Sequence, residues 1–487
     1  MNGITTRLNQ LIKPFRGEKG FDKPLLIVFF VVNSIVLVNA CLHDPGIGYD
    51  AYEHLKYIQA LSEMRLVTPD DSYEFFSPPL PYLLPALFDG LTGLKWYWVM
   101  KFAQFLNFLL SLCLTFYVIK VCRIISNRPQ LKFCSILLLG LLPVYYKTFA
   151  MVRGEPYVAF FSLVILYYCL MVSAEKSYNL KNASILGLAM GLCALSRQWG
   201  VLLFPAVFLY FIFEWVHLPT HRRDIARTLC VCLLVIFLIS GWFYAWLNIR
   251  YGSVTAFNRK PKPSFSLSNQ PLEFYFGLSP EMLFTDPVRP HFPNRFLPIF
   301  YSEMWGDYWG FFVVYGLDKN WPRYLDGWTL SEILATGQRP AWLETNYDTI
   351  GRYLGRVNLV SLFPSALAFM AIFVYFMGIT RRRTKEDHRK WEREVSKFLL
   401  LGMASTMMGY FWFLVMYPSI GKGDTIKTSY VLMILPYVAI LTGMLIVKIK
   451  KRWNGIYYFT LAALLICFIY NIRAMITNYS LHRLFLN

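Results

Sequence analysis

The sequence predicts an all-α polytopic protein that crosses a membrane about eleven times. Hydrophobic residues make up 56% of the 487 residues and the mean hydropathy is +0.41, both well above the values of soluble domains. Apolar runs close to the length of a membrane-spanning helix recur along the chain, separated by short basic segments. We therefore expect one membrane domain over residues 1–487, a helix bundle in which external loops form a cap.

The predicted spans begin close to the N-terminus. The run at 24–42 has the length of a spanning helix and lacks a small-residue cleavage site, so we expect a retained span and not a removed signal. The runs at 131–147 and 183–196 are the shortest. The eleven predicted spans are 24–42, 97–119, 131–147, 156–174, 183–196, 199–215, 228–247, 357–379, 398–417, 430–447 and 455–471.

Basic residues predict the orientation. Six segments between or beside the spans hold 26 of the 48 Lys and Arg residues; they are the N-terminal tail, 120–132, 175–182, 216–227, 381–397 and 448–452. Because basic loops stay in the cytoplasm, the loops at 43–96 and 248–356 are expected outside, as is the C-terminus. The same bias explains the net charge of +19, so nucleic acid is not an expected partner. The nine cysteines lie in or beside apolar runs and are expected to be packing residues.

The first external loop, 43–96, concentrates ionisable residues. Gly46 and Gly48 favour a chain break, after which 49–64 reads as a helix. The i, i+3, i+4 and i+7 spacing of Asp50, Glu53, His54 and Tyr57 places them on one helix face. They form either a reactive cluster or the solvated face of a helix lying on the membrane. The proline-containing run at 80–91 is too short to span and is expected to return the loop to the membrane surface.

Two further basic residues lie at the external ends of predicted spans. Arg153 and Glu155 occupy the turn between the third and fourth spans, where a local ion pair is the alternative to a ligand contact. Arg197 stands between two apolar runs that are too close for a long loop. Its guanidinium is expected either to reach water or to hold an anion.

The segment 417–430, YPSIGKGDTIKTSY, is a glycine-punctuated turn before a predicted span. Lys422, Asp424 and Lys427 are expected near a helix start, where backbone N–H groups and the helix dipole favour phosphate. An ordinary exposed loop, with Asp424 or Thr425 as helix cap, is the alternative.

The loop at 248–356 is rich in Pro, Trp, Tyr and Phe, a composition that predicts an ordered lid and not a tether. Glu303 and Asp307 stand among aromatic residues, a mixture suited to sugar rings. Aromatic packing within the cap is the alternative. The motifs GxxxxGK[ST], GxGxxG after a strand, and HExxH are missing from the sequence, which argues against a cytoplasmic nucleotide site.

Together these segments resemble the GT-C class of polyprenyl-phosphate-sugar-dependent glycosyltransferases, which includes protein O-mannosyltransferases and aminoarabinose transferases. The most specific part is the first external loop, in which an acidic residue, a Tyr/His-bearing helix and EFFSPPLPYLL follow one another. The resemblance implies that a loop carboxylate acts near the acceptor and that an outer basic residue holds the donor phosphate. Asp50 matches the first position, and Arg197, Lys422 and Lys427 are candidates for the second. The family's usual Asp-Glu pair is replaced by Asp50-Ala51, with Glu53 following, so either carboxylate could be the base.

The resemblance implies a membrane enzyme that moves a hexosyl or pentosyl group from a polyprenyl-phosphate-linked donor to a hydroxyl of a glycan, lipid or protein. The expected chemistry is a single displacement on the periplasmic or lumenal side, and a bacterial inner membrane is the expected location. Asp50 or Glu53 would be the base, with a pKa raised by burial or by its acidic neighbour. No metal ligands are predicted, but a divalent cation could join the carboxylates. The residues expected to contact substrates are His54, Tyr57, Arg153, Glu155, Arg197, Asp307, Lys422 and Lys427.

Two other functions fit parts of the sequence. A transporter or flippase of a lipid-linked saccharide would also have many spans and outer basic residues, and discontinuous helices at the midplane would favour it. A non-catalytic subunit of an envelope complex is the third possibility. The clustering of charged residues on one side favours the enzyme, because a transporter must serve both faces.

Overall fold

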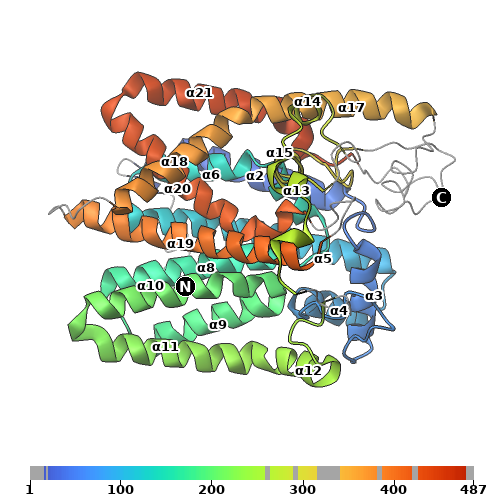
Figure 1. The fold of residues 1–487 in the computed structure, drawn as a ribbon, viewed down its shortest axis with the longest axis horizontal. Helices are drawn as coiled ribbons and strands as arrows, with labels where there is room; N and C mark the ends of the chain where they lie inside the picture. The colour runs from blue at the N-terminus through green and yellow to red at the C-terminus, as the bar shows by residue number, and fades with distance from the viewer. Residues whose placement is uncertain are drawn as a thin grey trace.

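The computed structural model describes residues 16–17, 20–257, 264–288, 294–314, 341–380, 387–418 and 426–478. They form a bundle whose long helices run roughly side by side (Figure 1). Near the N-terminus, β1 (Arg16–Gly17) and β2 (Gly20–Phe21) make a short antiparallel pair. The all-α polytopic fold expected from the sequence is confirmed.

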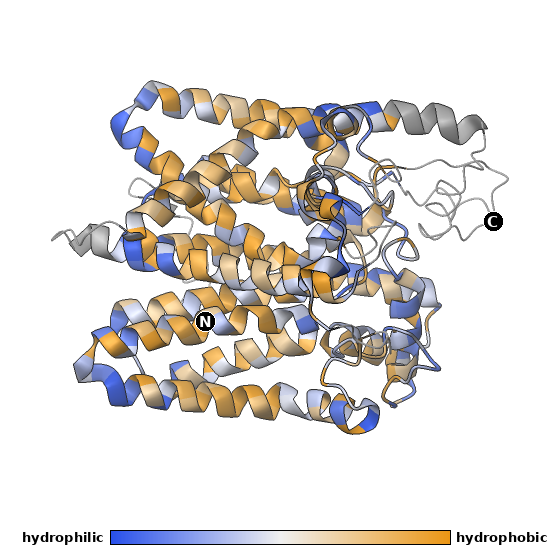
Figure 2. Ribbon diagram, in the orientation of Figure 1, coloured by the Kyte–Doolittle hydropathy of each residue, from blue (hydrophilic) through white to orange (hydrophobic). Residues whose placement is uncertain are grey.

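Within the described residues, nine helical stretches are long and apolar enough to cross a membrane. Their apolar residues occupy the middle of the bundle and their hydrophilic residues its two ends (Figure 2). The nine stretches are α2 (Lys23–Leu42), α5 (Trp96–Ile125), α8 (Glu155–Glu175), Gln198–His217, Pro219–Tyr251, Ile350–Thr380, Trp391–Met416, Thr428–Arg452 and Asn454–Met475.

Two of the eleven predicted spans, the short ones at 131–147 and 183–196, do not correspond to one of these nine stretches. In place of 131–147 the chain has α6 (Pro129–Gly140) and α7 (Pro143–Ala150), which meet at 67°. Pro143 has no N–H to continue the ladder of α6, which explains the break. Gly140 fits there because a Cβ would lie 2.4 Å from Val32 Cγ2. In place of 183–196 stands α9 (Leu180–Ser196), a 17-residue apolar helix.

Several spans are built from consecutive elements. A 3₁₀ turn, η2 (Gln198–Leu203), leads into α10 (Phe204–His217). Another, η7 (Thr428–Ile434), leads into α20 (Leu435–Arg452). The other components are η3 (Pro219–His221), α11 (Arg222–Ile236), the π-helical η4 (Phe237–Gly241), α12 (Trp242–Tyr251), α17 (Ala341–Val360), α18 (Leu362–Thr380), α19 (Asp387–Met416), α21 (Asn454–Asn471) and η8 (Ile472–Met475).

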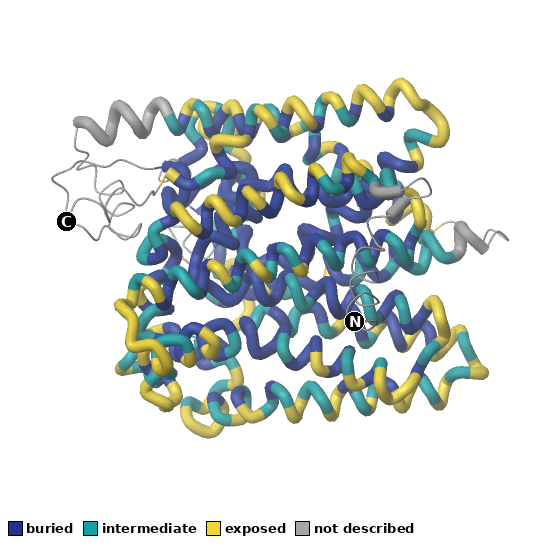
Figure 3. Tube along the Cα trace, turned by 180° about the vertical axis from the view of Figure 1, so that it is seen from behind, coloured by how far each residue is buried: buried dark blue, intermediate teal, exposed yellow. Residues whose placement is uncertain are grey.

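The most enclosed span is the one that contains α20, whose most apolar window is 94% buried. Helices α6, α18, α19 and α21 pack around it. Figure 3 shows buried residues through the centre of the bundle and exposed ones along the outermost helices. Those exposed residues are largely apolar, as is expected of helices that face lipid.

The short helices collect at one end of the bundle, which we call the loop end (Figure 1). The first external loop supplies α3 (Ala51–Ser62) and α4 (Leu80–Thr92), and the large loop supplies η6 (Leu267–Asn269), α13 (Leu272–Phe276), α14 (Pro280–Thr285) and α15 (Phe296–Trp305). The connections from α10 to α11 and from α20 to α21 lie at the opposite end. Which side of a membrane each end faces stays a prediction from the basic residues.

Candidate active site

Asp50 stands at the start of α3 in an unusual backbone conformation. Its φ is +57° and ψ is +26°, in the left-handed region, which costs a non-glycine residue about 1–2 kcal/mol. Its carbonyl oxygen accepts hydrogen bonds from the N–H groups of Glu53 and His54, at 3.0 and 3.1 Å. The predicted helix at 49–64 is thus observed as Ala51–Ser62, with Asp50 as its cap.

Both carboxylate oxygens of Asp50 have partners. The Tyr73 hydroxyl donates to Oδ1 at 2.6 Å, and Lys427 Nζ lies 3.4 Å from Oδ2. The side chains of Asp50 and Lys427 are 16% and 12% exposed, so this pair reaches the surface of the loop end. Burial acts to raise the pKa of Asp50, but the Lys427 ammonium and then the Tyr73 hydrogen bond outweigh it and hold this pKa well below its usual range. The expectation of a raised carboxyl pKa is therefore wrong for Asp50.

Glu53 anchors the loop that follows α3. Its carboxylate accepts the Tyr73 N–H at 3.0 Å and pairs with Lys56 at 2.9 Å. Of the two candidate bases, Asp50 is therefore the one that pairs with a basic residue from a distant segment.

His54 and Tyr57 face inward from α3, as their spacing predicts. His54 Nδ1 is 2.9 Å from the Tyr82 hydroxyl, and the two rings stack. Burial, above all, lowers the pKa of His54 to about 4, so the imidazole is neutral near pH 7. Tyr57 donates its hydroxyl hydrogen to the Ser77 carbonyl at 2.7 Å. Both side chains therefore connect α3 to the segment of the same loop that contains Ser77 and Tyr82.

Arg153 and Glu155 form a buried two-pronged ion pair. Arg153 Nε and Nη2 donate to the two oxygens of Glu155 at 2.9 and 2.7 Å. Arg153 Nη1 is buried and makes no hydrogen bond within the described part of the chain. The guanidinium carbon also lies 4.9 Å from the centre of the Tyr49 ring. The local ion pair weighed from the sequence is present, yet it leaves one donor of Arg153 unused.

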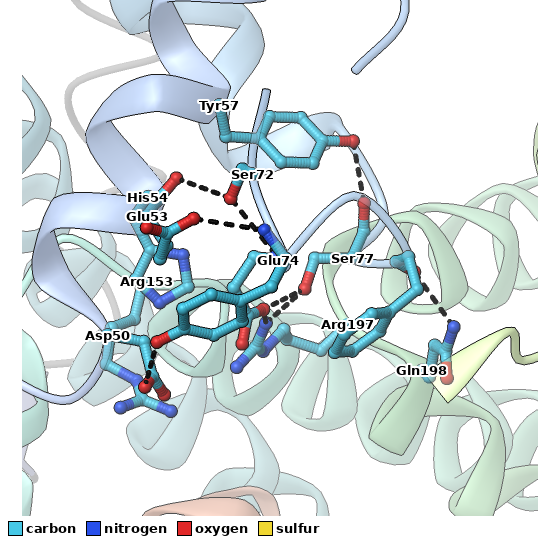
Figure 4. Close-up of polar contacts among 12 residues, drawn as sticks. Asp50, Glu53, His54, Tyr57, Ser72, Glu74, Ser77, Arg153, Arg197 and Gln198 are labelled. Carbon is cyan, nitrogen blue, oxygen red and sulfur yellow. Dashed lines mark hydrogen bonds and ion pairs between the residues drawn. The ribbon is translucent and has the colours of Figure 1, made fainter. Parts of the chain in front are cut away.

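Arg197 turns into the protein and does not snorkel to water. It bonds Glu155 at 3.2 Å, Glu74 at 2.8 Å and Ser77 Oγ at 2.5 Å. The anions that it holds are therefore the chain's own carboxylates, Glu155 and Glu74, of which Figure 4 labels Glu74. The approach is possible because residue 154 is glycine, where a Cβ would lie 2.6 Å from Arg197 Cγ.

Lys427 is placed by contacts on its backbone and on its side chain. Its N–H donates to the Tyr410 hydroxyl at 2.9 Å. Its ammonium lies 4.8 Å from the centre of the Tyr49 ring, the ring that Arg153 also contacts. Burial acts to lower the pKa of Lys427, but the Asp50 charge outweighs it and the net shift is upward. Lys427 immediately precedes η7, close to the helix start expected for it, whereas Lys422 and Asp424 lie outside the described residues.

The Asp307 carboxylate is taken up by contacts within the protein, which does not favour the substrate contact expected of it. It is fully buried and accepts the N–H groups of residues 311–314 at 2.6–3.2 Å. Lys147 lies 3.6 Å from it and also pairs with Glu303. The neighbouring Trp305 and Trp309 are buried too. Asp307 therefore lies within the packed aromatic part of the cap, the alternative considered from the sequence.

Sequence reasoning missed four residues of this region: Tyr49, Tyr73, Glu74 and Lys147. Glu74 opens the EFFSPPLPYLL segment, so an acid beside an apolar, proline-rich run was a usable signal. Lys147 also had a signal, as a lone cation in an apolar run. Nothing in the sequence marks Tyr49 or Tyr73 among the chain's 32 tyrosines.

The described residues contain no group of three His, Cys, Asp or Glu side chains arranged to hold a metal ion. The divalent cation considered from the sequence stays a prediction.

Comparison with known proteins gives matches in fold and none in sequence. No family model and no curated protein matches the chain. Among solved structures, the oligosaccharyltransferase of Archaeoglobus fulgidus tethered with an acceptor peptide matches at a TM-score of 0.48 and 12% identity, over 93% of this chain and 55% of that one. The same archaeal enzyme, AglB, in complex with an inhibitory peptide and a dolichol-phosphate matches at 0.47 and 12%, over 93% and 56%.

A second kind of structure also matches. ArnT of Cupriavidus metallidurans bound to undecaprenyl phosphate has a TM-score of 0.35 and 15% identity, over 88% of this chain and 80% of that one. This chain spans about half the length of the archaeal oligosaccharyltransferase. The likeness is one of overall fold.

Proposed function

We propose that this protein is a membrane glycosyltransferase that moves a sugar from a polyprenyl-phosphate-linked donor to an acceptor hydroxyl. The observation that carries the proposal is the meeting of Asp50 and Lys427 at the loop end. They come from segments 377 residues apart, and their pair is partly exposed above the buried Arg153. A carboxylate beside two cations, at the end of a membrane bundle, suits a donor whose phosphate sits at the membrane surface.

Lys427 and Arg153 are the proposed phosphate ligands. Arg197 is less suited, because Glu74, Glu155 and Ser77 already take up its donors. Lys427 pairs with Asp50 only at 3.4 Å, and Arg153 Nη1 is an unused donor in the structure as described. Both cations lie against the Tyr49 ring, so a phosphate could bridge them and reduce their mutual repulsion.

Asp50 is the proposed base. A phosphate that draws Lys427 away would remove the charge that holds the Asp50 pKa down, and the carboxylate would become more basic when donor is bound. The acceptor oxygen attacks the anomeric carbon and passes its proton to Asp50. The bond from that carbon to the phosphate oxygen breaks, and polyprenyl phosphate leaves with the electron pair. This single displacement inverts the anomeric centre and needs no covalent enzyme intermediate.

The broken helix at α6 and α7 is the feature that favours transport as a second candidate. Lys147 of α7, however, pairs with Glu303 and Asp307 of the large loop, which ties α7 to the loop end. We therefore place transport second. A periplasmic loop end and a bacterial inner membrane remain part of the proposal.

The proposal is tested by donor binding. Purified full-length protein in lipid nanodiscs should bind polyprenyl phosphate much more tightly than polyprenol, because the phosphate supplies the contacts with both cations. Lys427→Ala should weaken phosphate binding by about tenfold or more, as expected when a charge-assisted contact is lost. Arg65→Ala is the matched control, since Arg65 is an exposed cation of the first external loop that pairs with Glu63 and Asp71. Equal affinity for phosphate and polyprenol, or equal loss in the two variants, would contradict the proposal.

A further inference from the structure

Tyr73 occupies one oxygen of the proposed base. Its hydroxyl donates to Asp50 Oδ1 at 2.6 Å, and 47% of the residue is exposed. An acceptor hydroxyl that is to be deprotonated by Asp50 must make this same contact, an O–H donating to a carboxylate oxygen at hydrogen-bond distance. The other oxygen, Oδ2, faces Lys427. Tyr73 therefore stands where an acceptor hydroxyl would be needed.

The backbone that carries Tyr73 is held firmly. The Tyr73 N–H donates to Glu53, and the Ser72 hydroxyl donates to the Glu53 carbonyl oxygen at 3.1 Å. The next residue, Glu74, is paired with Arg197. Since the main chain is fixed on both sides while the ring is half exposed, the hydroxyl can leave Asp50 by rotation of the side chain alone. No movement of the loop is required.

We infer that the Tyr73 side chain is a gate that imitates the acceptor: its hydroxyl fills the acceptor's position on Asp50 until an acceptor alcohol displaces it. The inference rests on the proposed function, because it takes Asp50 as the base. It adds a role in acceptor entry for a residue that is not one of the proposed phosphate ligands. It also predicts that removal of the Tyr73 hydroxyl increases the rate of sugar transfer.

The test compares Tyr73→Phe, which keeps the ring and removes the hydroxyl, with the parental protein. The substrate is a polyprenyl-phosphate-linked hexose, and the acceptors are water, glycerol and octyl β-glucoside. We expect kcat/KM for the acceptor to rise about tenfold, the size expected when a competing hydrogen bond to a charged group is lost. Donor affinity should stay within about twofold, because Lys427 keeps its contacts.

Tyr52→Phe is the matched control. Tyr52 is an exposed tyrosine of α3 whose ring contacts Lys56, and the variant keeps that ring. Its rate should equal the parental rate. Tyr73→Leu, which also lacks the hydroxyl, should be faster than the parental protein and guards against an effect particular to phenylalanine.

The outcomes separate the two proposals. If the parental protein transfers sugar and both Tyr73 variants are slower or unchanged, the gate is wrong and the proposed function stands. If neither the parental protein nor any variant releases sugar or binds polyprenyl phosphate, the proposed function fails and the gate fails with it.

Discussion

Lys427 Nζ lies 3.4 Å from Asp50 Oδ2, although the two residues are 377 positions apart in the sequence. The pair joins the first external loop to the segment before α20, the most enclosed span. Beneath it, Arg153 and Arg197 share Glu155, and Arg197 also holds Glu74. The structure thus separates one partly exposed pair, Asp50 and Lys427, from a buried network of ion pairs.

The first prediction concerns Arg197 and stability. Arg197→Ala should lower the free energy of unfolding by about 3–5 kcal/mol, because it leaves Glu74 and Glu155 as buried charges with fewer partners. Arg197→Lys should also be destabilised, since a single ammonium cannot reproduce a guanidinium that bonds three groups. Thermal unfolding of the purified variants measures both. Arg65→Ala, an exposed arginine, should unfold at the parental temperature.

If Arg197→Lys keeps the parental thermal stability but no longer binds polyprenyl phosphate, this prediction is contradicted. Arg197 would then be the phosphate ligand.

The second prediction concerns pH. Burial, above all, lowers the pKa values of His54 and His43 to about 4 each. In the unfolded chain these imidazoles take up protons near pH 6.5, so between about pH 6.5 and 4 the unfolded state binds more protons than the folded state. The free energy of unfolding should therefore decrease as pH falls through this window and change little from these two residues above it.

Thermal unfolding measured from pH 7.5 to 4.5 checks this dependence. His54→Gln and His43→Gln should each reduce the slope between about pH 6.5 and 5.5, where the carboxyl groups of the unfolded chain stay largely ionised, and the double variant should reduce it most. A slope that the double variant leaves intact would assign the dependence to other groups.

The third prediction concerns orientation. Leu91, at the end of α4, is 86% exposed at the loop end, and Trp453, between α20 and α21, is 50% exposed at the opposite end. In a background where the exposed Cys41, Cys113 and Cys230 are serine, a membrane-impermeant maleimide should label Leu91→Cys in intact cells and Trp453→Cys only after lysis. The reverse pattern would invert the orientation.

Much of the fold could be predicted because membrane-spanning helices are recognised in a sequence by their length and apolar composition. The run at 24–42 corresponds to α2 almost residue for residue. The break between α6 and α7 was not predicted, because a proline inside an apolar run is also compatible with a kinked continuous helix.

The site was predicted in part. The spacing of Asp50 and His54 could be read locally, but the partner of each charge could not, since Lys427, Glu74 and Tyr73 reach Asp50 and Arg197 through tertiary packing. For this reason the lowered pKa of Asp50 could not be predicted from the sequence. From sequence the nearest charges were Glu53 and His54, whereas in space the strongest charged neighbour is Lys427.

The most direct test of the account is the rate of sugar transfer by Asp50→Asn from a polyprenyl-phosphate-linked donor. Asparagine keeps the shape of the side chain but cannot take the proton, so the rate should fall about 10²–10⁴-fold while polyprenyl phosphate still binds. Glu53→Gln should be milder, because its contacts anchor the loop. Transfer by purified Asp50→Asn at the parental rate would contradict the account.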